Sequence, residues 1–203
     1  YSDKEAFSIV QTIIEDLYKK QLIHVQEAKI FQCSCKRIEI TEQELMQIKK
    51  KESNLVIITE QGECMCKRCC TPLKEKKEKT LFWKLSAATI DIYPDYYKKD
   101  CQQFSKDYED TILRISRLRN TGIKVNVDKD IFNLDVDFVW KCVPLLKPGQ
   151  CILIASNKHL FELYCINCLM HQLGKEICFI AVPYISCTEE ERKILSEDTN
   201  NKV

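Results

Sequence analysis

Apolar residues recur three and four positions apart through the first twenty residues of the chain, with polar residues between them. The apolar positions are Ala6, Phe7, Val10, Ile13, Ile14, Leu17 and Tyr18. This spacing places the apolar side chains on one face of a helix. Ser2 or Asp3 is available to cap the first turn. The pattern therefore predicts an amphipathic N-terminal helix.

The middle of the chain combines several short patterns. Thr41 to Lys51 has helical character, and the alternating run Leu81-Phe82-Trp83-Lys84-Leu85 is typical of a strand. The lysine and glutamate residues from Lys74 to Lys79 predict a solvated strand or turn. Asp107 to Arg119 favours a helix, which Asn120-Thr121-Gly122 ends in a turn.

Longer apolar runs separated by one helical pattern follow in the last third of the chain. Residues 136–143, 150–155 and 177–182 are predicted as strands. Between the last two, apolar positions from Leu160 to His171 predict a helix that ends at Gly174. A strand, helix and strand of this length form a right-handed parallel crossover by default. The sequence therefore predicts an α/β fold with parallel strands.

Composition and charge narrow the classes of function. The chain has 203 residues, 31 lysines and arginines against 30 acidic residues, and a net charge of +1, so no overall charge draws it to nucleic acid or membrane. No apolar run reaches the roughly 20 residues that span a bilayer, and we expect no membrane contact. Only four glycines occur, and glycine-rich phosphate loops are absent. The chain has thirteen cysteines, and several of them, including Cys142, Cys165 and Cys168, lie within apolar stretches. Free thiols in the cytoplasm or another reducing intracellular compartment explain this placement better than a disulfide framework.

Two groups of cysteines form the clearest candidate site. The first is Cys33-Ser34-Cys35 and the second is Cys64-Met65-Cys66-Lys67-Arg68-Cys69-Cys70. Pairs on two separate turns can surround one Zn²⁺ with four thiolates. We predict a structural zinc site formed by Cys33, Cys35, Cys66 and Cys69, in which four thiolates leave no open position for catalysis. Free thiols are the alternative, and Cys64 and Cys70 are competing ligands.

Basic and aromatic residues form weaker candidate sites. Arg114, Arg117, Arg119 and Lys124 are a concentrated group that fits contact with an RNA backbone, and Arg114 and Arg117 would share one helix face. A solvated surface is the alternative for such basic residues. Aromatic side chains such as Trp83 and Trp140 can stack on bases, although core packing is the ordinary fate of such residues.

Several short motifs occur in a recognisable order. They are Asp16-Leu17-Tyr18, Cys66-Lys67-Arg68-Cys69-Cys70, Leu81-Phe82-Trp83-Lys84-Leu85, Ile115-Ser116-Arg117, Phe138-Val139-Trp140 and Leu153 to Gly174. Their order resembles the middle of a class I methionyl-tRNA synthetase. The resemblance implies a partial Rossmann-like core with parallel strands and an inserted zinc knuckle. It divides the chain into an N-terminal helix of the core (1–30), the knuckle (31–80), the second half of the core (81–190) and a tail (191–203).

The chain departs from that family at the positions that carry its chemistry. The HIGH signature is absent, and Lys193-Ile194-Leu195-Ser196-Glu197-Asp198 places acidic residues where the family has a cationic loop. The family's glycine, lysine and aspartate are replaced at Ala155, Ser156 and Asn157, and its helix histidine is replaced by Glu162. Trp140, Asn157 and Glu162 would line a vestigial pocket. We therefore expect no catalytic residues and no ATP cofactor.

These features lead to three functional hypotheses. The first is a non-catalytic, synthetase-like module in an RNA or multiprotein assembly, where a protein partner covers an exposed sheet edge and tRNA-like RNA is a second possible partner. The second is a fragment or subunit of a divergent synthetase that activates methionine with ATP and charges tRNA. The third is an unrelated zinc-stabilised interaction module, which predicts no parallel strands between residues 150 and 182.

Overall fold

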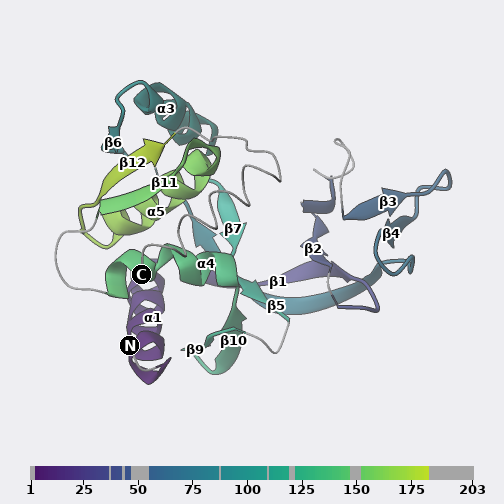
Figure 1. Cartoon of the computed structure of the whole chain (residues 1–203). Coiled ribbons are helices and arrows are strands. Elements are labelled where there is room, and N and C mark those ends of the chain that lie inside the picture. The colour runs from purple at the N-terminus through teal and green to yellow at the C-terminus, as the bar shows by residue number, and fades with distance from the viewer. Residues whose placement is uncertain are drawn as a thin grey trace, which may run out of the picture.

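The amphipathic helix predicted at the N-terminus is α1 (Asp3–Lys19), and it packs on the main core of the protein. The computed structural model describes residues 3–36, 38–42, 44–46, 55–86, 88–108, 110–118, 122–146 and 152–182. Val10, Ile14 and Leu17 are fully buried along one face of α1. Figure 1 shows a body of helices and short strands from which a long β-ribbon carries a small subdomain.

The ribbon consists of β1 (Ile23–Gln32) and β5 (Lys74–Lys84), which pair antiparallel from Ile23 opposite Trp83 to Gln32 opposite Lys74. Strand β2 (Glu39–Thr41) joins β1 at the distal end, and β7 (Ile112–Arg114) joins β5 at the body. Leu81 and Trp83 are buried at the root, whereas the lysines and glutamates of residues 74–79 lie along the exposed distal part. The solvated and aromatic runs predicted separately are therefore one continuous strand.

The parallel sheet predicted from the apolar runs is confirmed. Strands β11 (Ile152–Ser156), β12 (Cys178–Val182) and β6 (Ile92–Tyr93) pair parallel in the order β11-β12-β6. The short 3-10 turn η2 (Asn157–His159) and helix α5 (Leu160–Gln172) connect β11 to β12. Helix α3 (Tyr97–Tyr108) packs against α5. The third hypothesis, which required the absence of such strands, is contradicted.

Two smaller sheets complete the molecule. Strands β8 (Ser116–Arg117), β10 (Asp130–Leu134) and β9 (Lys124–Val127) form an antiparallel sheet in that order beside α1. Strands β3 (Val56–Ile58) and β4 (Cys64–Cys66) form a hairpin in the subdomain at the end of the ribbon. Among the described residues, no helix has the length and apolar character needed to cross a membrane.

Two local predictions are wrong. The helix expected over 107–119 ends as α3 at Tyr108, and the residues after it form β7 and β8 because they pair with the β5 edge and with β10. The buried strand expected over 136–143 is helix α4 (Val136–Lys141) followed by the 3-10 turn η1 (Val143–Leu146). The carboxylate of Asp135 accepts a hydrogen bond from Asp137 N and caps α4.

Two separate clusters of buried apolar side chains hold the fold together. The larger one joins α1, the root of β5, α5 and the parallel sheet. The smaller one lies in the subdomain and contains Cys33, Ile38, Ile40, Leu45, Val56 and Cys66. We call the subdomain with this second cluster the knuckle. Most of the helix predicted over 41–51 and all of the 191–203 tail lie outside the described residues.

Candidate metal centre

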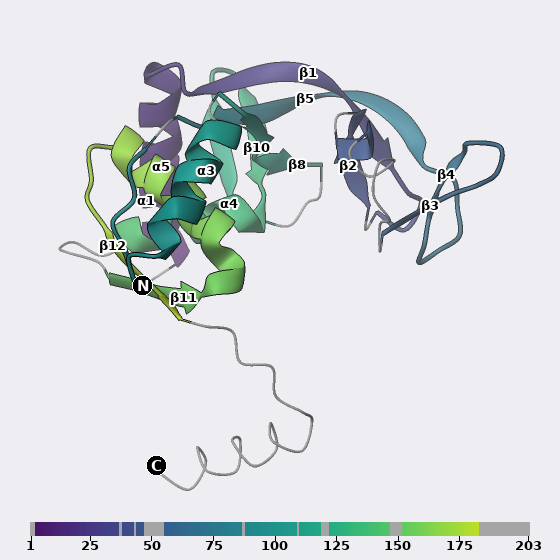
Figure 2. The same ribbon diagram turned by 90° about the horizontal axis from the view of Figure 1, so that it is seen from above.

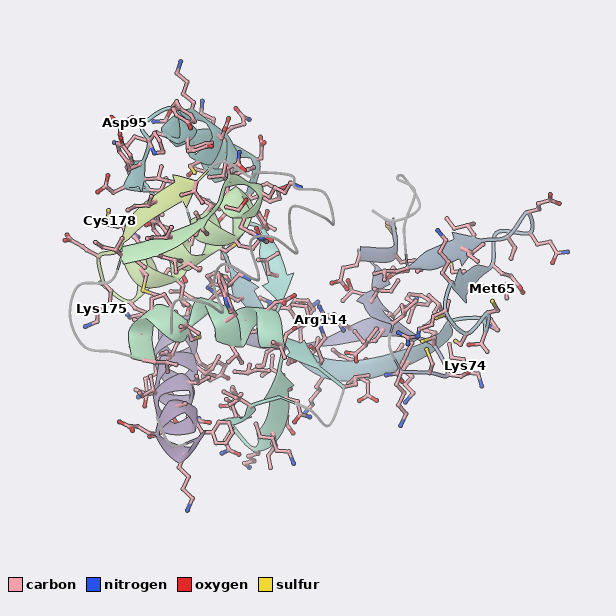
Figure 3. The ribbon with its side chains drawn as sticks, viewed as in Figure 1. Met65, Lys74, Asp95, Arg114, Lys175 and Cys178 are labelled. Carbon is pink, nitrogen blue, oxygen red and sulfur yellow. The ribbon has the colours of Figure 1, made fainter. Side chains whose placement is uncertain are left out.

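Four cysteine sulfurs come together inside the knuckle. The Sγ atoms of Cys33, Cys35, Cys66 and Cys69 all lie within 4.8 Å of one another. The Sγ atoms of Cys35 and Cys66 are 3.8 Å apart, and those of Cys33 and Cys35 are 3.1 Å apart. Figure 3 shows this part of the knuckle beside the labelled Met65 and Lys74. Two segments that are some thirty residues apart in sequence therefore deliver their thiols to one point.

Two tight turns position these thiols. In the first turn, Lys36 N donates to Cys33 O over 2.9 Å, and Ile38 N donates to the Cys33 sulfur over 3.3 Å. In the second, Cys70 N donates to Cys66 O over 2.9 Å. Lys36 and Cys70 adopt left-handed φ angles of 56° and 52°. Such residues reverse the chain directly after a cysteine, so that both cysteines of a pair point to the same side.

The dimensions of the group fit a tetrahedral metal ion. Thiolates bound to Zn²⁺ at about 2.3 Å form a tetrahedron with edges of about 3.8 Å. The Cys35–Cys66 separation has this length, and the other separations lie around it within the 4.8 Å limit. The two competing ligands, Cys64 and Cys70, both lie outside this group of four, and Cys70 is exposed. These four residues can therefore hold one metal ion.

The environment of Cys69 favours its ionised form. The hydroxyl of Thr71 lies 3.0 Å from the Cys69 sulfur, and hydrogen bonding from Thr71 is the main cause that lowers the pKa of this thiol to about 6. Hydrogen bonds with the sulfurs of Cys66 and Cys35 lower the pKa further. A thiolate is the form that binds metal.

The thiols of the main core have the opposite character. Burial raises the pKa of Cys142 and of Cys165 to about 12 and that of Cys168 to about 11. The Cys168 thiol also donates to Ser86 O over 3.3 Å. These protonated thiols serve as small apolar side chains in packing.

The predicted basic group is divided by the structure. Arg114 and Arg117 lie on strands β7 and β8 rather than on one helix face. The Arg114 side chain is 2% exposed, and that of Glu39 is fully buried. Arg114 Nη1 lies 3.1 Å from Glu39 Oε1. Lys124 is exposed on β9, and Arg119 lies outside the described residues. RNA contact by this group stays a prediction, and Arg114 is poorly suited to it.

The acidic partners of these arginines were not indicated by the sequence. Glu39 O accepts hydrogen bonds from Arg114 Nη2 and Arg117 Nη1, and Glu39 Oε1 accepts one from Leu118 N over 2.9 Å. Arg117 Nε also donates to Asp135, the residue that caps α4. Figure 3 shows Arg114 at the junction between the body and the ribbon. We call these residues, Glu39, Arg114, Arg117 and Asp135, the brace.

The residues of the predicted vestigial pocket come from three neighbouring elements. Asn157 lies in η2 directly after the carboxyl end of β11, and Glu162 lies in the first turn of α5. The Glu162 carboxylate lies 3.9 Å from His159 Nδ1. Trp140 is partly exposed on α4. The structure therefore places Asn157 and Glu162 at the edge of the parallel sheet where α/β folds commonly bind ligands.

One face of the parallel sheet is apolar and uncovered by the described residues. Ile152 and Ile154 of β11 are 62% and 63% exposed, and Val182 of β12 and Tyr93 of β6 are exposed beside them. The alternate residues, including Phe179 and Ala181, point into the main core. Figure 2 shows β11 and β12 at the rim of the body, with the helices on one side of them. We call the exposed side the open face.

Comparisons with known proteins identify the fold. No protein-family model and no curated protein matches the sequence. Among solved structures, Mycobacterium tuberculosis methionyl-tRNA synthetase bound by methionyl-adenylate aligns with 15% identity and a TM-score of 0.58, over 89% of this chain and 39% of that one. The apo form of the same enzyme aligns with 14% identity and a TM-score of 0.57, over 91% of this chain and 40% of that one. The chain thus spans about two fifths of the length of these enzymes, and over most of its own length it has the class I synthetase fold.

Proposed function

We propose that the chain is a non-catalytic, synthetase-like module that works in complex with a partner polypeptide, with a zinc ion fixing the shape of its knuckle. The open face is the observation that carries this proposal. Parallel sheets occur almost always with both faces covered, because the helices that connect their strands pack on the faces. Here the described residues cover one face only, with Ile152 and Ile154 more than 60% exposed on the other.

The energetics favour a protein partner for this surface. Burying the exposed part of each isoleucine would contribute about 1–2 kcal/mol, since full burial of such a side chain contributes about 1.5–3 kcal/mol. Among the described residues, strand β11 is also the edge of its sheet, and an edge strand can pair with a strand of another chain. The proposed partner therefore offers an apolar surface to the open face. Because the Arg114 guanidinium is buried, a protein surface is a better supported partner than RNA.

Zinc is the metal that suits the knuckle best. Cys33, Cys35, Cys66 and Cys69 provide four sulfur ligands, the set typical of structural zinc sites. A bound zinc ion would link the two cysteine turns and close the loop between them. Four thiolates fill the coordination sphere, so the site supports a structural role.

The residues at the sheet edge support the absence of catalysis. The Ser156 hydroxyl accepts a hydrogen bond from Lys158 N and caps η2, and Asn157 follows it. Glu162 adds a carboxylate at the start of α5, where negative charge opposes binding of a nucleotide triphosphate. In the synthetase family that the chain resembles, the positions of Ser156, Asn157 and Glu162 carry other residues. Binding of methionyl-adenylate is described for the M. tuberculosis enzyme and is not expected here.

The experiment isolates the tagged full-length chain from its own cells. We expect one stoichiometric protein partner with the wild-type chain and its loss with Ile154→Glu, which places a charge on the open face. Ile131→Glu is the matched control, because Ile131 is equally exposed but lies on β10. Recovery of the wild-type chain alone, or of the same partner with Ile154→Glu, would overturn the proposed interface.

The same complex tests whether the module is catalytic. We expect no methionine-dependent exchange of pyrophosphate into ATP by the chain alone or by the isolated complex. Exchange that depends on this chain would establish the rival hypothesis of a divided synthetase. Nuclease treatment that releases the partner would show that RNA holds the assembly together.

A further inference from the structure

A cavity of about 610 Å³ lies on the side of the body formed by α3, the C-terminal end of α5 and the segment from Ala88 to Asp91. None of the four knuckle cysteines lines it, and none of the open-face residues does. The volume lies within the range of small-molecule sites, which is about 300–1,000 Å³. This cavity is separate from the metal centre and is independent of the proposed function.

Helix α3 lines the cavity with one polar face. Lys98, Gln102, Ser105 and Lys106 all line it, and their spacing places them along one side of the helix. The rings of Tyr108 and Phe161 lie 4.6 Å apart, and those of Phe104 and Tyr164 lie 6.2 Å apart. These pairs show that α3 and α5 run antiparallel. His171, at the end of α5, therefore faces the beginning of α3 across the cavity.

The charges of the lining favour an anion. Two lysines and one carboxylate line the cavity, and the carboxylate, Asp91, lies 3.8 Å from the Lys98 ammonium. Lys98 also pairs with Asp95 at 3.0 Å, so its charge is largely compensated. No side-chain hydrogen bond or ion pair joins Lys106 or His171 to another described residue. Lys106 thus adds a positive charge that is not paired with a carboxylate among the described residues.

The remaining lining indicates the size and type of ligand. Ala88, Ile90 and Cys101 form an apolar part of the wall, and Cys101 is fully buried there. Gln102 and Ser105 provide hydrogen-bond donors and acceptors. The lining contains no aromatic ring on which a nucleobase would stack. These features suit a compact, hydroxyl-rich molecule that carries a phosphate group.

We propose that this cavity binds a small sugar phosphate, with the Lys106 ammonium as the main contact of its phosphate group. Thr89, Gln102 and Ser105 line the same cavity and bind the hydroxyl groups. Lysine is a common ligand of phosphate, and a charge-assisted hydrogen bond is about twice as strong as a neutral one. The phosphate group therefore supplies most of the affinity, and the sugar contributes through the fit of its shape to the cavity.

The test is a calorimetric titration of the metal-loaded, full-length chain with ribose 5-phosphate, inorganic phosphate and ribose. We expect saturable binding of one ribose 5-phosphate, weaker binding of inorganic phosphate and none of ribose. Lys106→Gln is expected to weaken binding of ribose 5-phosphate about tenfold, the effect of losing one charge-assisted contact. Lys129→Gln, which removes an exposed lysine from the turn between β9 and β10, should leave the affinity unchanged.

Circular dichroism of both variants verifies the fold, which is not expected to change because both lysines are exposed. The proposal is overturned if ribose 5-phosphate does not saturate the chain, if ribose binds equally well, or if the two variants bind alike. Partner binding at the open face has a separate readout, so this result and that of the proposed function remain distinguishable.

Discussion

Replacing Arg114 with methionine tests the brace most directly. The substitution keeps most of the side-chain volume but removes three contacts of the guanidinium: 3.1 Å to Glu39 Oε1, 2.6 Å to Glu39 O and 3.4 Å to Glu44 Oε2. The Glu39 side chain is fully buried, so its charge cannot be hydrated without local rearrangement. Removing one partner of a buried ion pair typically costs about 3–5 kcal/mol.

The remaining partners of Glu39 set the expected value within that range. Leu118 N still donates to Glu39 Oε1, and Arg117 Nη1 still donates to Glu39 O. We therefore expect Arg114→Met to lower the free energy of unfolding by about 3 kcal/mol, near the lower limit for a buried pair. The assay is urea denaturation of the metal-loaded chain, monitored by circular dichroism.

A double variant and a surface control make this result decisive. In Arg114→Met with Glu39→Gln the uncompensated carboxylate is gone, so the double variant should lose no more stability than Arg114→Met alone. Lys79→Met breaks the Lys79–Asp130 ion pair of 2.7 Å, but both side chains are exposed, and its cost should stay below about 1 kcal/mol. A loss below about 1 kcal/mol for Arg114→Met, equal to that of the surface pair, would refute the assignment of a buried, stabilising brace.

Three further predictions concern the cysteines and the glycines. Cys66→Ser should abolish binding of one zinc ion per chain, measured by elemental analysis, whereas Cys70→Ser should retain the metal because Cys70 lies outside the group of four. Burial raises the pKa of Cys142 to about 12, so this thiol is protonated at pH 8 and should react with a disulfide reagent only after unfolding. Exposed Cys70 should react at once. Prompt modification of Cys142 would contradict its burial. Gly122→Ala should lower the free energy of unfolding in urea by at least about 2 kcal/mol, because the new Cβ would lie 2.5 Å from Leu134 O at a φ of 123°. Gly174 has a φ of 66° and free space for a Cβ, so Gly174→Ala should lower it by about 1 kcal/mol. Equal losses of stability in the two variants would contradict this distinction.

Long, regular patterns were sufficient to predict the elements that form the core. Helix α1 and the crossover from β11 through α5 to β12 each contain enough apolar positions to fix their type and buried face. The spacing of the cysteines likewise predicted the group that the structure brings together. In these cases the determining residues lie close together in sequence or follow a known ligand spacing.

The missed elements depend on contacts between distant segments. Residues 112–117 follow a helix and contain arginines, but they form strands because β5 and β10 offer edges with which they pair. The Glu39–Arg114 pair joins residues 75 positions apart, and no local pattern marks either one as buried. The cavity beside α3 was missed for the same reason, since Lys106 and His171 line one cavity only after α3 and α5 pack together.

The knuckle is attached to the body at two points, the ribbon and the brace, and this has a mechanical consequence. In the middle of the ribbon, around residues 27–29 and 77–79, β1 and β5 pair with each other and with no third strand of the described residues. A two-stranded ribbon is more strongly twisted than a larger sheet, and no third strand fixes the amount of its twist. The brace connects β2 with the strands β7 and β8 outside the ribbon axis, and so it opposes torsion where the ribbon alone would not. We therefore expect this charge cluster to restrict the orientation of the metal centre relative to the body.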